Sequence, residues 1–354
     1  MPETFAVVRL GSLGDVVLTT GVLKYWNKRL GHSFVVISRS AWTEVFTDHP
    51  EVEDIVPVSA QNLSLRGWMN LGRRLRHQYG RLELIDLHAN LRTLILRSMW
   101  PARTHVYSKL SLARRLYALT KNKHFTASLL SRNIPQRYAA ALSGPVPPRA
   151  ELVPELFLKP EEIRAAQSLL KPGRTTICLH PYATHQAKQW PAGHWKKLIQ
   201  LIEDQGWSWL IIGRGTERLF FSHQQDLTGR TSIRQTAALL SLSQALVTAD
   251  SGPMHLATGA KTPVVALFGP TTREWGFFPS GPVDQVLEAD LKCRPCSLHG
   301  SSAGRCSGQC MNFIQPEQVM KTLHQICRQN SSNGNSSALF KQSRGQAPQG
   351  LFLD

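Results

Sequence analysis

Hydrophobic positions in the first third of the chain form short apolar runs that alternate with longer segments of helical periodicity. Short apolar runs bounded by turn residues are typical of buried strands, and apolar residues three and four apart are typical of helices. The alternation predicts a parallel sheet covered by helices on both faces. The expected strands are residues 5–10, 34–37, 54–58, 82–87 and 104–107, and the clearest helical patterns are 16–30 and 63–77.

A stretch with five prolines, residues 143–160, interrupts this pattern and is the best candidate for an interdomain linker. A second alternation follows, with expected strands at 175–179, 207–212, 245–247 and 263–268, expected helices at 192–204, 232–240 and 253–259, and a last helix opening at Pro316. We therefore predict an α/β protein with two doubly wound domains, residues 1–155 and 156–328, and a disordered tail, 329–354. Such domains bind ligands beyond the carboxyl ends of their strands, which predicts a central cleft.

Charge is the most unusual bulk property, because 41 Lys and Arg residues against 24 Asp and Glu residues give a formal net charge of +17. Residues 87–150 contain eleven basic residues and no acidic one. A field of one sign attracts nucleic acid, an anionic membrane surface or a phosphorylated substrate. Apolar residues mixed with bases at helical spacing in 91–100 and 107–119 favour a lipid surface, although a solvated basic face is the alternative. We expect no nucleic-acid partner, because no recognised motif accompanies the charge.

Targeting and membrane-spanning segments are not evident in the sequence. The first ten residues lack a basic segment followed by an apolar one, and no stretch approaches the roughly 18 apolar residues that a span needs. Six cysteines in 354 residues do not suggest a secreted disulfide scaffold. We expect a cytoplasmic protein attached peripherally to the inner face of the membrane.

The strand, turn and helix expected at 245–259 have the features of a phosphate-binding site. Gly252 lets the backbone approach a ligand, and Pro253 suits the first helical position because its missing N–H has no partner there. The amides that follow, at Met254 and His255, lie at the positive end of the helix dipole. The segment therefore predicts a site for a diphosphate.

Polar residues around this turn have both functional and structural interpretations. Asp250 either binds a sugar hydroxyl or caps the helix, and Ser251 is an equally good cap. Lys188 precedes a Trp-Pro pair on a loop that leaves a strand, which predicts a cation facing the same cleft. Glu217, shortly after Gly213, either accepts hydrogen bonds from a ligand or lies in the first turn of a helix.

The first turn of the chain resembles a phosphate loop but carries an acid. Gly11 and Gly14 do not fit the dinucleotide-binding pattern G-x-G-x-x-G. Asp15 lies where the first strand ends and the first helix begins, on the domain opposite the predicted phosphate site. A carboxylate at this position either takes a proton from an attacking hydroxyl or serves as an N-cap.

The possible metal ligands in the sequence argue against a magnesium site and allow a zinc site. No pair of aspartates is spaced as D-x-D, so the usual magnesium-binding pair of metal-dependent sugar-nucleotide enzymes is missing. Lys188 and the helix dipole would neutralise a diphosphate leaving group instead. Four cysteines spaced as C-x2-C-x9-C-x3-C either hold a structural zinc ion or are free thiols or a redox-dependent bridge; they are Cys293, Cys296, Cys306 and Cys310.

Several of these segments together resemble glycosyltransferase family 9, the ADP-heptose:lipopolysaccharide heptosyltransferases. The segments occur in the family's order and cover nearly the whole chain from residue 5 to about residue 326; they are VVRLGSLGDVVLTTGVL, HPEVEDIVPV, IDLHANLRT, HPYATHQAKQWPAGHW and TADSGPMHLATGAKTPVVALFGPT. The resemblance implies a GT-B fold of two facing Rossmann-like domains. It departs from the usual family pattern at Tyr182, where a glycine is common, and at Pro253.

The resemblance also implies roles for individual residues, with Asp15 as the general base and Lys188 as the phosphate-binding cation. The residues expected to bind the donor are His180, Thr184, Lys188, Gly213, Glu217, Asp250, Ser251, Gly252, Pro253, Met254 and His255. The residues expected to bind the acceptor are Gly14, Asp15, Arg66, Asp86, His88 and Arg92.

The expected activity is inverting, metal-independent transfer of heptose from ADP-heptose to the inner core of lipopolysaccharide. No cofactor is required, and a structural zinc ion is the one metal that the sequence suggests. The alternatives are a GT-B enzyme that transfers or epimerises another nucleotide sugar, and a non-catalytic protein that binds nucleic acid or other anions. The sequence does not indicate an oligomeric state.

Overall fold

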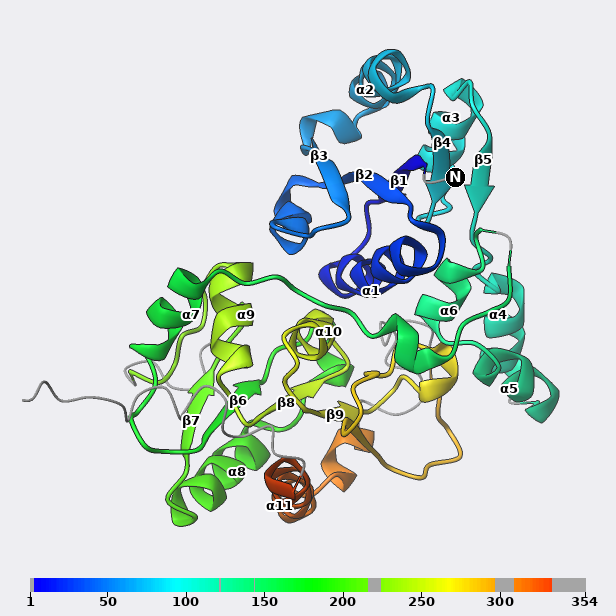
Figure 1. The fold of residues 1–354 in the computed structure, drawn as a ribbon. Coiled ribbons are helices and arrows are strands. Elements are labelled where there is room, and N and C mark those ends of the chain that lie inside the picture. The colour runs from blue at the N-terminus through cyan, green and yellow to red at the C-terminus, as the bar shows by residue number, and fades with distance from the viewer. Residues whose placement is uncertain (1–2, 121, 143, 216–223, 297–308, 333–354) are drawn as a thin grey trace, which may run out of the picture.

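The computed structural model describes residues 3–120, 122–142, 144–215, 224–296 and 309–332, and these residues form two five-stranded sheets covered by helices (Figure 1). The strands of the N-terminal sheet are β1 (Thr4–Arg9), β2 (Ser33–Arg39), β3 (Val52–Val58), β4 (Glu83–Asp86) and β5 (Thr104–Val106). Those of the C-terminal sheet are β6 (Thr176–His180), β7 (Ser208–Ile211), β8 (Ala245–Ala249), β9 (Val264–Phe268) and β10 (Gln285–Glu288). The prediction of two doubly wound α/β domains is confirmed.

Strand order determines where each sheet can bind a ligand. The N-terminal order is β3-β2-β1-β4-β5 and the C-terminal order is β10-β9-β8-β6-β7, with the paired strands parallel throughout. The direction of winding therefore reverses between β1 and β4 in one sheet and between β6 and β8 in the other. The loops that leave adjacent strands at such a reversal diverge and open a crevice at the carboxyl edge. The residues after β1, β4, β6 and β8 are therefore the ones that the topology places at binding positions.

Helices cover both faces of each sheet. The helices of the N-terminal part are α1 (Leu13–Leu30), α2 (Leu65–Tyr79), α3 (Leu91–Met99), α4 (Ser111–Thr120), α5 (Lys123–Leu130) and α6 (Ile134–Ala139). In the C-terminal part they are α7 (Pro160–Gln167), α8 (Ala192–Asp204), α9 (Ile233–Ser241), α10 (Gly252–Gly259) and α11 (Pro316–Ser332). Alternate residues of β1 pack against α1 on one face and against α2 and α3 on the other, and β6 likewise separates α9 and α10 from α8 and α11.

The expected strands are all present, with ends that differ by at most two residues from the prediction. The bounds of α8 and the start of α11 at Pro316 agree with it, and α11 continues to Ser332, four residues into the expected tail. Strand β10 and the short helices α5, α6 and α7 were not predicted. Residues 333–354 lie outside the described part of the chain.

The two domains meet where the N-terminal ends of α1 and α10 approach each other, and glycines make this approach possible. A methyl group added at Gly14 of α1 would lie 2.6 Å from Cδ2 of His255. One added at Gly252 of α10 would lie 3.1 Å from Cβ of Leu13. Figure 1 shows α1 between its own sheet and the C-terminal domain. One continuous hydrophobic core runs from the buried face of α1 to α9 and α10.

The segment that joins the domains packs into the same interface. The backbone N–H of Leu156 donates to the carbonyl of Gly259, the last residue of α10, at 2.9 Å. On the α1 side, the carbonyl of Leu152 lies so close that a methyl group at Gly21 would be 2.4 Å from it. Arg234 of α9 adds an ionic contact across the interface, because it pairs with both Glu162 of α7 and Asp48 of the N-terminal domain.

Gly21→Ala tests whether this interface needs a glycine. The added methyl group would meet the carbonyls of Leu152 and Val153, and backbone atoms cannot move aside as a flexible side chain can. We expect the free energy of unfolding in urea to fall by about 1–3 kcal/mol, as for overpacked cores. Gly193→Ala in α8 is the matched control, because nothing lies within 4 Å of its added methyl group; equal losses in the two variants would contradict the account.

Candidate functional site

Asp15 lies in the first turn of α1 and is held by residues from three segments. Its Oδ2 atom is 2.6 Å from Nη2 of Arg9, the last residue of β1. Its Oδ1 atom accepts a hydrogen bond from the hydroxyl of Tyr138 at 3.0 Å, and Ser12 donates to Oδ2 at 3.1 Å. The N-cap of α1 is Ser12. The N-cap interpretation of Asp15 is therefore wrong, and its carboxylate instead pairs with Arg9 and Tyr138 at the end of β1.

The electrostatic surroundings keep this carboxylate ionised. Burial raises the pKa of the Asp15 carboxyl, and the charge and hydrogen bond of Arg9 lower it. The hydroxyls of Tyr138 and Ser12 act in the same direction, so the pKa lies below its usual range. The group is therefore a carboxylate at neutral pH, and 16% of its side chain is exposed.

Cations gather around Asp15 and Tyr138; Arg9 was not predicted, whereas Arg114 and Arg137 belong to the basic stretch 87–150. Arg9 also stacks over the ring of Tyr138, with its Cζ atom 5.2 Å from the centroid. Arg137 is 3% exposed, and within the described chain its Nε and Nη1 atoms have no hydrogen-bond partner. Asp15 and Arg114 interact electrostatically as well, and burial lowers the pKa of that arginine. A charged residue in a buried strand, as at Arg9, is the one sequence feature that could have indicated this cluster.

The loop between β4 and α3 brings a histidine to the same place. Burial, followed by the nearby charges of Arg9 and Lys109, lowers the pKa of His88 to about 3. The side-chain amide of Asn90 lies 2.8 Å from Nε2 of His88. Asp15 also acts electrostatically on His88, so the structure brings these two predicted acceptor residues together. The imidazole is neutral at neutral pH.

The structure places the predicted acceptor residue Asp86 in the interior, beneath the loop that carries His88. It is fully buried, and its Oδ1 atom accepts hydrogen bonds from the backbone N–H groups of His88 and Ala89 at 2.9 and 2.7 Å. Its Oδ2 atom lies 3.1 Å from Nε of Arg97. This carboxylate is engaged by its own loop and has no surface for direct contact with an acceptor. It shapes the loop that carries His88.

The predicted acceptor residues Arg66 and Arg92 lie together on a neighbouring surface. They occupy the first turns of α2 and α3, and both are exposed. The two helix starts are joined by a 2.7 Å hydrogen bond from the Trp68 indole to the carbonyl of Arg92. The exposed surface formed by the starts of α2 and α3 is called the outer rim of the N-terminal domain below.

On the C-terminal domain, Lys188 and Asp250 form an ion pair. The Nζ atom of Lys188 is 2.7 Å from Oδ2 of Asp250, and the hydroxyl of Thr271 donates to the same oxygen at 2.8 Å. The Trp-Pro pair after Lys188 holds its loop as expected, because Trp190 is buried and its indole donates to the carbonyl of Ile314. The structure thus brings together Lys188 after β6 and Asp250 after β8, the two strands that flank the reversal.

His180 and Ser251 form a second polar cluster at this edge. Thr248 lies between them, with its hydroxyl 3.1 Å from Nδ1 of His180 and 3.0 Å from the hydroxyl of Ser251. Burial lowers the pKa of His180 to about 4. Ser251 is the N-cap residue of α10 but makes no side-chain cap hydrogen bond, so the capping interpretation of its hydroxyl is wrong.

Tyr182, which stands where the usual family pattern has a glycine, packs against the loop after β7. A methyl group at Gly215 would lie 2.3 Å from the Tyr182 ring, so the ring packs on the backbone of the loop after β7. Its hydroxyl lies 2.6 Å from that of Thr228. The other glycine of this loop, Gly213, packs against His180 in the same way.

The start of α10 faces the start of α1. Pro253 and Gly252 open the helix, Met254 is buried beneath it, and His255 is 4% exposed beside Gly14. Burial lowers the pKa of His255 to about 4. Within the described residues its Nδ1 atom has no hydrogen-bond partner.

The remaining predicted residues add little to this geometry. Thr184 is exposed on the loop after β6. Glu217 and Cys306 lie outside the described residues, and the described part of the chain has no group of three His, Cys, Asp or Glu residues arranged for a metal ion. The zinc site at Cys293, Cys296, Cys306 and Cys310 stays a prediction.

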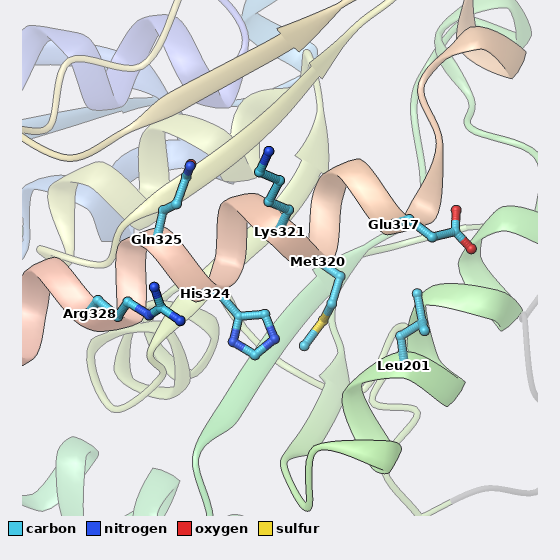
Figure 2. A pocket seen from close by; sticks show the side chains of 7 residues that line it. All are labelled: Leu201, Glu317, Met320, Lys321, His324, Gln325 and Arg328. Carbon is cyan, nitrogen blue, oxygen red and sulfur yellow. The ribbon is translucent and has the colours of Figure 1, made fainter.

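A hollow of about 520 Å³ lies away from these residues, on the opposite side of the C-terminal sheet. Figure 2 shows it between Leu201 of α8 and Met320 and His324 of α11. The helices that line it are those that pack on the sheet face turned away from α10. The described polar clusters, and not this groove, therefore define the candidate functional site.

Two facing Rossmann-like domains with polar clusters at both carboxyl edges define a GT-B protein. The model of glycosyltransferase family 9 (heptosyltransferase) matches residues 68–306, and the chain belongs to this family. It is therefore a glycosyltransferase. Lipopolysaccharide heptosyltransferase 1 of Pseudomonas aeruginosa is 28% identical over 313 residues, which are 82% of this chain and 85% of that protein.

Solved structures agree on the fold. A glycosyl transferase family 9 protein from Veillonella parvula superposes with a TM-score of 0.73 at 19% identity, covering 92% of this chain and 98% of that one. The ADP-heptose LPS heptosyltransferase II of E. coli superposes with a TM-score of 0.69 at 20% identity, covering 93% and 99%.

The lowered pKa values of His180 and His255 predict a loss of stability in mild acid. Their pKa values lie near 4 in the folded protein and near 6.5 in the unfolded chain, so the unfolded state binds more protons between these limits. We expect each histidine to lower the free energy of unfolding by about 2 kcal/mol between pH 7 and pH 5. Glutamine does not titrate in this range, so the free energy of unfolding of His255→Gln should fall by about 2 kcal/mol less between pH 7 and pH 5 than that of the unmodified protein. Urea titrations at the two pH values measure this difference, and an identical pH dependence in the two proteins would contradict the prediction.

Proposed function

We propose that this glycosyltransferase moves heptose from ADP-heptose to the inner core of lipopolysaccharide with inversion at the anomeric carbon. The observation that carries the proposal is the arrangement of one carboxylate, Asp15, opposite one cation and one helix start, Lys188 and α10. Similarity to a lipopolysaccharide heptosyltransferase over most of both chains supports the substrate class.

On the acceptor side, Asp15 takes the proton of the attacking hydroxyl. The hydroxyl then approaches the anomeric carbon from the face opposite the leaving ADP, which inverts the configuration. Arg9 and Tyr138 hold the carboxylate in one orientation and keep it ionised.

On the donor side, the leaving diphosphate gains negative charge as the glycosidic bond breaks. Lys188 and the backbone N–H groups at the start of α10 stabilise this charge, since both are oriented before the reaction begins. Asp250 holds the lysine and accepts from a donor hydroxyl. Lys188 and the helix dipole supply the positive charge in this proposal, so the reaction needs no metal ion.

The cations around Asp15 favour an anionic acceptor. Arg137 has unpartnered, buried guanidinium nitrogens among the described residues, and Arg114 and Lys109 lie in the same electrostatic cluster. A carboxylate or phosphate group next to the accepting hydroxyl would satisfy these donors.

The outer rim of the N-terminal domain suits an anionic membrane surface at the cytoplasmic side. Within the described part of the chain, no helix combines the length and apolar character required to cross a bilayer. Leu65, Leu91 and Leu94, at the starts of α2 and α3, are 69%, 73% and 50% exposed. They lie beside Arg66 and Arg92, and residues 55–150 contain only two acids, Glu83 and Asp86, of which each is paired. Such exposed leucines can insert into a lipid interface, while the arginines beside them are attracted to its anionic headgroups.

Asp15→Asn tests the proton acceptor. The amide keeps the shape of the side chain but cannot take a proton, so kcat should fall by about 10²–10⁴-fold, measured as ADP release with lipopolysaccharide acceptor. ADP affinity measured by calorimetry should stay unchanged, which also shows that the variant is folded. Full activity in Asp15→Asn would contradict the assignment.

Lys188→Ala tests the phosphate cation. Loss of a charged hydrogen bond to the diphosphate should weaken ADP binding about tenfold or more, measured by calorimetry in EDTA. Lys261→Ala is the control, because that lysine is largely exposed and pairs with Glu155 at the surface. Equal ADP affinity in the two variants would contradict the assignment of Lys188 to the donor site.

Replacing Leu65, Leu91 and Leu94 together by serine tests the membrane rim. Each leucine withdrawn from lipid should cost about 1 kcal/mol, so binding to phosphatidylglycerol vesicles should fall by tenfold or more in a sedimentation assay. Leu169→Ser is the matched control, since Leu169 is 51% exposed on the other domain. Unchanged vesicle binding with normal transfer to a lipid-free acceptor would contradict the rim and leave the reaction intact.

A further inference from the structure

The loop after β9, residues 269–272, is part of the candidate donor site although it carries no charged residue. Its Thr271 donates a 2.8 Å hydrogen bond to Oδ2 of Asp250, the oxygen that also pairs with Lys188. This hydroxyl is the second anchor of Asp250. The position of the loop therefore decides how the Asp250 carboxylate is aimed.

Arg294 holds this loop from within the C-x2-C segment. Its guanidinium donates to the carbonyls of Gly269 and Thr271, at opposite ends of the turn, and to the carbonyl of Ala289. Its Nη2 atom also lies 2.7 Å from Oε2 of Glu288, and its side chain is only 8% exposed. The planar guanidinium has five N–H donors in a fixed geometry, which a lysine cannot reproduce.

Two other contacts fix the same turn. The backbone N–H of Cys296 donates to the carbonyl of Pro270 at 3.0 Å. On the other side, a methyl group at Gly269 would lie 2.5 Å from Sδ of Met311 and 3.2 Å from Sγ of Cys310. The loop is thus enclosed between residues 294–296 and residues 310–311, and of these neighbours Arg294 is the one that bridges two carbonyls of the loop.

We infer that Arg294 is a positioning residue for the donor site, an inference that rests on the proposed function. By fixing the carbonyls of residues 269 and 271, it directs the hydroxyl of Thr271 to Asp250 and so keeps the Asp250–Lys188 pair in the geometry that receives the diphosphate. Arg294 itself reaches neither substrate. The C-x2-C segment thereby gains a role in the reaction that does not depend on metal binding.

A double-mutant cycle with Thr271 tests this role. Arg294→Ala and Thr271→Val should each weaken ADP binding about tenfold in calorimetry on the full-length protein in EDTA. The double variant should bind no more weakly than either single variant, because both changes release the same hydrogen bond to Asp250. Arg294→Lys should resemble Arg294→Ala, since a lysine cannot bridge the two carbonyls. Thermal unfolding of each variant separates this effect from simple loss of folded protein.

Arg273→Ala is the matched control. Arg273 pairs with the same Glu288 at 3.1 Å, but its side chain is 48% exposed, and it donates a further hydrogen bond to the carbonyl of Val286. ADP affinity should be unchanged in this variant. If the Arg294 variants bind ADP as the unmodified protein does, or if the double variant shows the sum of the two single effects, the positioning role is overturned and the donor site stands. If the unmodified protein binds no ADP, both the donor assignment and the positioning role are overturned.

Discussion

The close approach of two helix starts, made possible by Gly14 and Gly252, is the constraint on which the rest of the structure depends. Side chains at these positions would separate α1 from α10, and with them the two sheets. Because the strand order of each sheet reverses beside the helix concerned, the same contact sets the two carboxyl edges opposite each other. The hydrophobic core shared by α1, α9 and α10 then stabilises that arrangement. The geometry of the candidate site is therefore a consequence of backbone packing, before any polar residue is considered.

Opposite charge patterns on the two edges give this arrangement its chemistry. The N-terminal edge holds the Asp15 carboxylate inside a group of cations, which keeps it ionised and, in the proposed reaction, attracts an anionic acceptor. The C-terminal edge holds a cation, Lys188, steadied by Asp250 and set beside the positive end of a helix dipole. The buried imidazoles of His180 and His255 are neutral at neutral pH and leave this balance undisturbed. One edge can accept a proton while the other accepts a leaving diphosphate.

The sequence predicted the parts of this structure whose causes are local. The bounds of α8 and the start of α11 at Pro316 follow from nearby turn residues and periodicity, and the rule that ligands bind at strand ends located Asp15, Lys188 and Asp250. Residues that act over long sequence separations were missed, because nothing near Tyr138 indicates a partner 123 residues away. Asp86 was assigned to the acceptor because sequence does not reveal that its own loop engages the carboxylate. Short elements such as β10 gave too few periodic positions to predict.

The most direct test of the account is a calorimetric titration of the purified protein, in EDTA, with ADP and with ADP-, UDP-, GDP- and CMP-linked sugars. The account predicts selective binding of ADP and ADP-heptose without a divalent metal, since Lys188 and the start of α10 provide the positive charge. A preference for another nucleotide would contradict the proposed donor while leaving the glycosyltransferase family intact. Binding that appears only when a divalent metal is restored would contradict the metal-independent diphosphate site.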